Sequence, residues 1–140
     1  MVHSAGLAII YKKNKILLVH PTNAKWMGSY SIPKGHVELG ETALEAAIRE
    51  TKEEIGVEFY INSVFSVERE LYYTKNKAEK PWKKLSYFII HIDDLSQIGL
   101  TSEIIPKEQL QSIEVDWAGF VSFSEATRRL SPALLKIIEQ

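Results

Sequence analysis

The stretch that decides the fold is GHVELGETALEAAIRETKEEIGV, which runs from Gly35 to Val57. It predicts one helix between Glu41 and Val57. Thr42 with Glu45 three residues later fits a capping box, which satisfies free N–H groups of the first helical turn. Gly56 suits the left-handed conformation just past a helix end. The residues at the spacing of a buried helix face are Leu44, Ala47, Ile48, Thr51 and Ile55.

The same helix carries an unusual group of carboxylates. Glu50, Glu53 and Glu54 stand at i, i+3 and i+4, so they project from neighbouring turns on one side. Like charges at this spacing repel and weaken a helix unless a cation lies between them. Clustered hard oxygen ligands suit Mg²⁺ or Mn²⁺, and a bound ion would turn the repulsion into a site for phosphate oxygens. The alternative is a solvated acidic face, with Arg49 and Lys52 as ion-pair partners.

The complete pattern resembles the Nudix box. That motif reads Gly, five residues, Glu, seven residues, Arg-Glu, an apolar residue, any residue, Glu-Glu, any residue, Gly and an apolar residue. Its fixed positions are matched by Gly35, Glu41, Arg49, Glu50, Glu53, Glu54 and Gly56. A chance match in such a chain is on the order of one in a million or less. The departure is Thr51 at the first apolar position, where its methyl group can still face the core.

The resemblance implies a Nudix-type α/β/α sandwich with a mixed β-sheet, in a single domain over residues 1–140. Strand and helix patterns that mix without regular βαβ alternation favour the same class. The resemblance also implies roles for the residues of the box, residues 35–57. The metal ligands would be Glu50, Glu53, Glu54 and the carbonyl of Gly35, with Arg49 and Glu41 orienting them. One of the glutamates, or one outside the box, would take a proton from the attacking water.

Relatives in this family often recruit one more acidic residue from outside the box. Residues 114–126 read EVDWAGFVSFSEA and resemble the pattern that precedes the last sheet strand, with Phe120 in place of the usual tryptophan. Glu114 is therefore expected to join the metal ligands and the catalytic group. The alternative is a surface glutamate at the start of a strand. Weaker candidates are Asp116, Glu103 and Glu108.

The flanks of the box resemble the asymmetric diadenosine tetraphosphate hydrolases. The matching stretches are 33–38, 69–73 and 85–88, whereas Asp93 to Ser112 looks longer than in that subfamily. The resemblance places an adenine ring on Tyr87, and stacking of this kind contributes about 1–3 kcal/mol in nucleic-acid binders. The alternative for Tyr87 is a core tyrosine. Lys34 and His36 are expected to contact phosphate, and solvation is the expected role of the lysines between Thr74 and Lys84.

The expected function is a metal-dependent pyrophosphohydrolase, in which water attacks phosphorus in a nucleoside diphosphate-linked substrate. The preferred substrate is a bis(5′-nucleosyl)-tetraphosphate, which would be cleaved asymmetrically. One alternative is a mononucleotide pyrophosphatase that removes damaged nucleoside triphosphates. An alternative of another class is a non-catalytic Nudix module that binds a nucleotide and regulates another process. Mg²⁺ or Mn²⁺ is the expected cofactor of the enzyme.

The amino-acid composition limits the kinds of binding partner that are expected. The 140 residues carry a net charge of −1, which argues against electrostatic capture of nucleic acid polymers or membranes. Without cysteine there is no disulfide framework or thiol chemistry. No apolar run is long enough to span a bilayer, and the N-terminus lacks signal-peptide features. A cytoplasmic protein with a small-molecule nucleotide substrate is expected, and the sequence leaves its oligomeric state open.

The rest of the chain predicts short elements around the box. The expected strands are Leu7–Tyr11 and Ile16–Val19 as a hairpin, Tyr30–Ile32, Phe59–Tyr73, Leu85–Ile92 and Val115–Phe123. Helices are expected from Glu125 to Leu130, capped by Ser124, and from Pro132 onward, capped by Ser131. Asp93 to Ser112 is expected to be irregular, with one helical turn after Pro106. Trp26 lies in an expected loop, where it either contacts substrate or covers the core.

Overall fold

A mixed β-sheet forms the centre of the computed structural model, which describes residues 1–59, 66–74 and 80–139. Within those residues the sheet has six strands in the order β4-β5-β1-β2-β6, with β3 paired to β1. β1 and β5 are parallel, and the other pairs are antiparallel. The strands are β1 (Val2–Tyr11), β2 (Lys15–Pro21), β3 (Lys34–His36), β4 (Val67–Tyr73), β5 (Lys83–Ile92) and β6 (Val115–Ser122).

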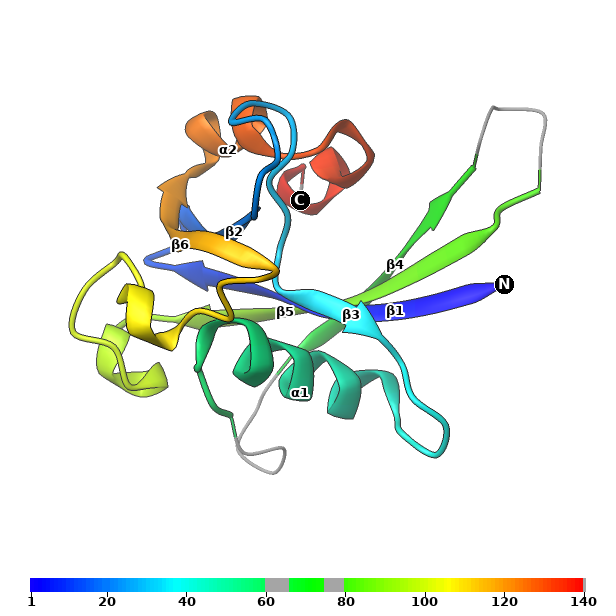
Figure 1. Cartoon of the computed structure of the whole chain (residues 1–140), viewed down its shortest axis with the longest axis horizontal. Helices are drawn as coiled ribbons and strands as arrows, with labels where there is room; N and C mark the ends of the chain where they lie inside the picture. The colour runs from blue at the N-terminus through cyan, green and yellow to red at the C-terminus, as the bar shows by residue number, and fades with distance from the viewer. Residues whose placement is uncertain (60–65, 75–79, 140) are drawn as a thin grey trace.

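Two different strands pair along one edge of β1. At its end, Ile10 pairs with Ile16 of β2 across the expected hairpin. Near its start, Gly6 pairs with Lys34 of β3. The sheet therefore divides beside β1, with β2 and β6 leading one way and β3 the other (Figure 1).

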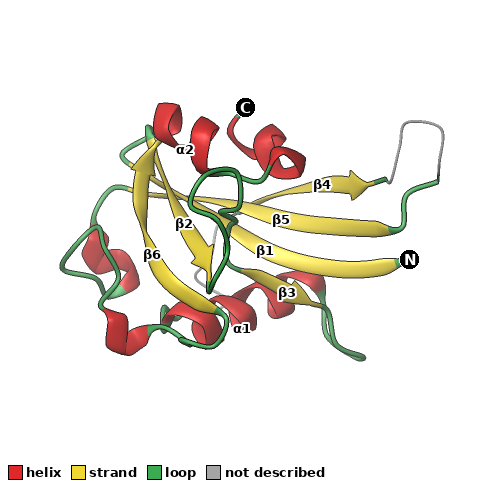
Figure 2. Cartoon of the chain, turned by 45° about the horizontal axis from the view of Figure 1, so that its top comes forward, coloured by secondary structure: helices red, strands yellow, loops and turns green. Residues whose placement is uncertain are grey.

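Helices cover both faces of the sheet. The helix α1 (Ala43–Ile55) lies on one face, and α2 (Phe123–Arg129) with the 3₁₀ helix η4 (Pro132–Ile138) lies on the other (Figures 1 and 2). Alternate residues of β1 pack into the apolar clusters on the two faces of the sheet, because successive side chains of a strand point to opposite faces. Leu7 and Ile9 pack in the cluster that includes α1, and Ala8 and Ile10 pack in the cluster that includes α2 and η4. This arrangement confirms the α/β/α sandwich.

Local signals of the box are confirmed in α1. The Thr42 hydroxyl accepts a hydrogen bond from the Glu45 N–H at 3.1 Å, and the Glu45 carboxylate accepts one from the Thr42 N–H at 2.9 Å. Gly56 ends the helix with φ of 70°. Thr51 is fully buried, and its hydroxyl donates to the Ala47 carbonyl at 2.8 Å. The polar atom at the apolar position of the motif is thus satisfied within the helix.

The C-terminal elements differ from expectation at their starts. Ser122, rather than Ser124, caps α2, because its hydroxyl accepts from the Glu125 N–H at 3.1 Å. The helix begins where β6 ends, so no loop separates them. Pro132 opens η4 as expected, but the Ser131 side chain makes no capping bond and the helix is 3₁₀. In the described part of the chain, no helix is both long and apolar enough to cross a membrane.

The region after the box is less regular than a single long strand. Glu58 and Phe59 form no strand, β4 begins at Val67, and residues 60–65 lie outside the described residues. The expected helical turn after Pro106 is present as η3 (Lys107–Gln109). A second turn, η2 (Leu95–Ile98), was not expected. Its sequence signal is Asp94 with Gln97 three residues later, which forms a capping box.

Tyr87 lies in the core. It is 5% exposed and belongs to the apolar cluster on the face of the sheet that α2 and η4 cover. Leu71 and Ile89 are in the same cluster. The ring is enclosed in this structure, so the burial supports the alternative of a core tyrosine over the expectation of a stacked adenine.

The burial of Tyr87 makes a testable prediction. Tyr87→Ala is expected to lower the free energy of unfolding by about 3–5 kcal/mol, because it leaves a large cavity in the core. Tyr87→Phe keeps the ring and should cost far less. Urea denaturation of the two variants measures both effects. A Tyr87→Ala protein that is as stable as the parent, with a raised KM, would instead place the substrate on this ring.

Candidate functional site

A cleft of about 160 Å³ opens at the place where β2 and β3 diverge. β2, the approach to β3, α1 and the start of β6 all contribute to it. Its lining residues are Val19, Pro21, Ser31, Ile32, Lys34, Glu54, Glu114 and Val115. The cleft thus brings together Lys34, Glu54 and Glu114, which are far apart in the sequence and were each expected at the site.

Gly35 lies directly against the carboxylate of Glu50. A Cβ atom at position 35 would be 2.0 Å from Cδ of Glu50 and 2.3 Å from each of its carboxylate oxygens. Any other residue would displace this carboxylate, so glycine here permits the close approach and is not needed for an unusual φ angle. The contact brings the α1 carboxylate to the backbone of β3, as expected if both act on one ligand.

Arg49 ties the box together. Its guanidinium donates to both oxygens of Glu41, at 2.7 and 2.9 Å, in a bidentate pair. It also donates to Glu50 at 2.9 Å, to Glu53 at 3.2 Å and to the carbonyl of His36 at 3.0 Å. The Arg49 hydrogen bond holds the pKa of Glu41 below its ordinary value, and these acceptors raise the pKa of Arg49. One cation thereby fixes the loop before α1, β3 and two box carboxylates.

Glu54 is a buried acid beside a half-buried base. Burial, followed by the charge of Glu50, raises the pKa of Glu54 to about 8, although the backbone N–H and the ammonium of Lys34 oppose the shift. Burial, followed by the charge of Lys83, lowers the pKa of Lys34. A carboxyl group with its pKa near neutrality in a cleft is typical of functional sites.

The carboxylates of Glu50, Glu54 and Glu114 lie close enough to affect one another. Burial is the main cause of the raised pKa of Glu50, and the charges of Glu53 and Glu114 add to it. Glu114 has the same effect on Glu54. This set of oxygen donors fits a hard divalent cation. As the described side chains stand, however, no group of three acidic or histidine residues is close enough to hold one ion, and both Glu50 and Glu53 are paired with Arg49.

A cationic and aromatic group lies on the same face of the sheet as Lys34. Lys34 pairs with Gly6, and Tyr73 and Lys83 pair with each other, so β3, β4 and β5 each contribute. The Lys83 ammonium is 5.1 Å from the centre of the Tyr73 ring, and Tyr73 is only partly buried. Tyr73 was not among the site residues expected from the sequence, and Lys83 was expected to be solvated. Their signal would have been the alternation of β4, which places Tyr73 and Tyr72 on opposite faces.

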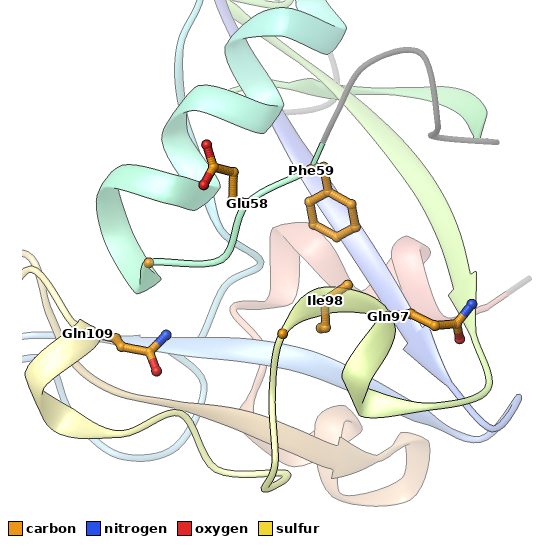
Figure 3. Close-up of a pocket in the computed structure, with 7 residues that line it drawn as sticks. Glu58, Phe59, Gln97, Ile98 and Gln109 are labelled. Carbon is orange, nitrogen blue, oxygen red and sulfur yellow. The ribbon is translucent and has the colours of Figure 1, made fainter.

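Two other predicted features lie outside this arrangement. His36 is exposed on β3, and its carbonyl rather than its ring meets the box through Arg49. A separate pocket of about 270 Å³ lies between the end of α1 and η2 (Figure 3). Its polar side chains are already engaged: Glu58 pairs with Lys52, Gln97 accepts from the Asp93 and Asp94 N–H groups, and Gln109 donates to the Ile55 carbonyl. We therefore take the cleft, rather than this larger pocket, as the candidate functional site.

Comparison with known proteins finds relatives in sequence and structures with the same fold. The NUDIX domain model matches residues 1–140. An asymmetrical bis(5′-nucleosyl)-tetraphosphatase of Rattus norvegicus is 42% identical over 112 residues, covering 73% of this chain and 74% of that protein. An ADP-ribose pyrophosphatase of Methanocaldococcus jannaschii is 46% identical over 59 residues, 42% of this chain, and the chain spans only 35% of its length. The crystal structure of a C. elegans Ap4A hydrolase binary complex superimposes on this chain with a TM-score of 0.67 and 23% sequence identity. The match covers 99% of this chain and 93% of that one, which shows a shared fold.

The raised pKa of Glu54 makes the metal-free protein sensitive to pH. Between the unfolded pKa of 4.5 and the folded pKa of about 8, only the folded state keeps this proton, so stability falls as pH rises through that window. We expect a loss on the order of 3 kcal/mol attributable to Glu54. Urea denaturation of the parent and of Glu54→Gln, from pH 5 to 8 in chelator, measures it as the difference between the two curves. Parallel curves would mean that Glu54 is ionised in the folded protein at neutral pH.

Proposed function

This chain belongs to the Nudix hydrolase family, and we propose that it is a divalent-metal-dependent pyrophosphohydrolase of nucleoside polyphosphates. The observation that carries the proposal is that Glu54 and Glu114 line one cleft with Lys34, and that Glu50 is close enough for its charge to act on Glu54. Carboxylates bind the cation, and the lysine attracts phosphate oxygens. A cluster of like charges with one member, Glu54, buried destabilises the protein by itself, which favours a functional over a structural role.

Nudix hydrolases generally need divalent metal ions, and we assign the ion here to Mg²⁺ or Mn²⁺. The residues that would hold it are Gly35 through its carbonyl, Glu50, Glu53, Glu54 and Glu114. A bound ion would neutralise phosphate oxygens and lower the pKa of a water molecule. Arg49 and Glu41 keep the ligands in place, since they join β3 to α1 through charge-assisted bonds.

The protein residues supply the proton chemistry. Water adds across a P–O–P bond, the attacking oxygen bonds to one phosphorus atom, and the bridging oxygen leaves with the other. We assign Glu54 as the acceptor of the water proton, because it is the box glutamate that lines the cleft. Glu53 is the other candidate among the box glutamates. Lys34, which also lines the cleft, can stabilise the negative charge on the departing phosphate through its ammonium group.

The preferred substrate is a bis(5′-nucleosyl)-tetraphosphate. Two aromatic groups lie on opposite sides of β1 in the strand order: Tyr73 with Lys83 on the β4–β5 side, and exposed Trp26, stacked on His20 of β2, on the other. A substrate with a base at each end of a phosphate chain suits this arrangement. The similarity to the rat tetraphosphatase supports the same substrate class.

A second candidate is a mononucleotide pyrophosphatase, which needs only one of the two aromatic groups. A human relative named 8-oxo-dGDP phosphatase NUDT18 is 37% identical over 57 residues, 41% of this chain and 18% of that protein. A third, non-catalytic candidate would bind nucleotide without turnover.

A product-resolved screen separates these candidates. Diadenosine tetraphosphate, 8-oxo-dGTP and ADP-ribose are incubated with the protein and Mg²⁺ or Mn²⁺. Asymmetric cleavage of the first gives ATP and AMP, whereas a mononucleotide pyrophosphatase releases pyrophosphate from the second. Excess chelator should abolish turnover. Saturable binding of these compounds without any product would identify the non-catalytic module.

The glutamates of α1 provide a matched set of variants. Glu54→Gln and Glu53→Gln are each expected to lower kcat by about 10²-fold or more, in the range for loss of a general base. Glu54→Gln should also stabilise the metal-free protein at pH 8, since it removes the buried charge. Glu58→Gln, outside the cleft, is the control and should retain activity. Retained activity in both Glu53→Gln and Glu54→Gln would remove these residues from the mechanism.

Tyr73 tests the substrate-binding face. Tyr73→Leu should raise KM by roughly 5- to 150-fold, the equivalent of about 1–3 kcal/mol of stacking. kcat should change less, because stacking acts equally on ground and transition states. Tyr73→Phe keeps the ring and should resemble the parent. Tyr72→Leu, on the opposite face of the same strand, is the control. An equal rise in KM for both leucine variants would show a general effect on the sheet.

A further inference from the structure

The strand pairing beside the cleft contains a register shift. β2 and β6 pair residue by residue from Lys15 with Ser122 to His20 with Trp117. The next pair is Pro21 with Val115, so Asp116 has no partner across the ladder. An unpaired residue of this kind bends its strand and re-aims the neighbouring side chains. Val115, Glu114 and Pro21, which follow the shift, all line the cleft.

His20 holds the unpaired residue. The imidazole is 1% exposed, and its Nδ1 lies 2.5 Å from a carboxylate oxygen of Asp116. Its Nε2 lies 3.1 Å from the carbonyl oxygen of Lys25. Both ring nitrogens lie within hydrogen-bond distance of an oxygen atom. A buried ring with two such contacts is a rigid connection between β2, β6 and the loop that follows β2.

That loop adjoins a residue that lines the cleft, because it follows Pro21 of β2. The ring of Trp26 stacks on His20, with centroids 4.2 Å apart and an angle of 11° between planes. The Thr22 N–H donates to the carbonyl of Glu114 at 3.0 Å, and the Thr22 hydroxyl donates to the carbonyl of Ser112 at 2.8 Å. The loop is therefore attached both to His20 and to the segment that presents Glu114.

We propose that His20 and Asp116 are positioning residues, which place Glu114 beside Glu50 and Glu54 and hold Trp26 in the loop that follows β2. Neither side chain lines the cleft, so they act through the shift in register and through the loop. The part of this inference that concerns catalysis rests on the proposed function. The part that concerns metal binding and loop order does not depend on which compound is hydrolysed.

The experiment compares His20→Phe and Asp116→Leu with the conservative variant Asp116→Asn. Phenylalanine keeps a ring under Trp26 but donates no hydrogen bond. Asparagine keeps an oxygen acceptor for Nδ1. His91→Phe, at an exposed position on β5, is the control. Each folded variant is measured for Mn²⁺ affinity by calorimetry, for kcat and KM, and for the rate at which trypsin cleaves after Lys25, whose carbonyl His20 holds.

We expect His20→Phe and Asp116→Leu to lose about 10- to 100-fold in Mn²⁺ affinity and in kcat, the usual effect of removing a residue that orients a metal ligand. Cleavage after Lys25 should accelerate, because the loop opens more readily. Asp116→Asn and His91→Phe should remain close to the parent in all three measurements.

Two results would overturn the inference. Unchanged Mn²⁺ affinity in folded His20→Phe and Asp116→Leu would exclude a role in placing Glu114, even if trypsin cleavage accelerated. A loss in Asp116→Asn equal to that in Asp116→Leu would show that the hydrogen-bond geometry is not what matters. Failure of the parent to hydrolyse any nucleotide would refute the proposed function, whereas the calorimetric and proteolytic comparisons would still decide the roles of His20 and Asp116.

Discussion

The contact between the Glu50 carboxylate and Gly35 is the constraint on which the site depends. It brings a charged side chain of α1 against the backbone of β3, where no Cβ atom fits. Such an approach leaves a carboxylate partly out of water, which is unfavourable unless a cation or donor compensates. Arg49 compensates by bonding to Glu50 and to the β3 carbonyl of His36 at the same time. The contacts that hold α1 on the sheet are therefore the same contacts that position the acidic cluster.

The cleft is also a place where the fold gives up stability. Glu54 and Lys34 are removed from water beside other charges, and their pKa values move toward one another in consequence. A hydrophobic pair of similar volume would stabilise a structural protein better. Local conflict of this kind is expected at functional sites, since the groups needed for chemistry are not those that best fill a core. The apolar layers on both faces of the sheet offset the loss.

The features that the sequence predicted correctly depend on neighbouring residues. The capping box of Thr42 and Glu45, the left-handed Gly56 and the hairpin after Tyr11 all involve short-range interactions. Errors arose where the outcome depends on tertiary contacts. Ser122 and Ser124 are equally good helix caps in isolation, and the end of β6 decides between them. Tyr73 and Tyr87 are both aromatic residues on strands, and only the cover of α2 and η4 buries Tyr87.

The same distinction explains why the reaction can be inferred more readily than the substrate. The box residues that would act at the phosphorus atom lie within one loop and one helix, so their spacing in sequence determines their spacing in space. The residues that would bind the two ends of a substrate come from β2, β3, β4 and β5, and the distances between them depend on strand register. A one-residue shift, such as the one at His20 and Pro21, changes which side chains face the cleft without changing the motif. Specificity can therefore vary along these strands while the box, held by Arg49 and Gly35, stays the same.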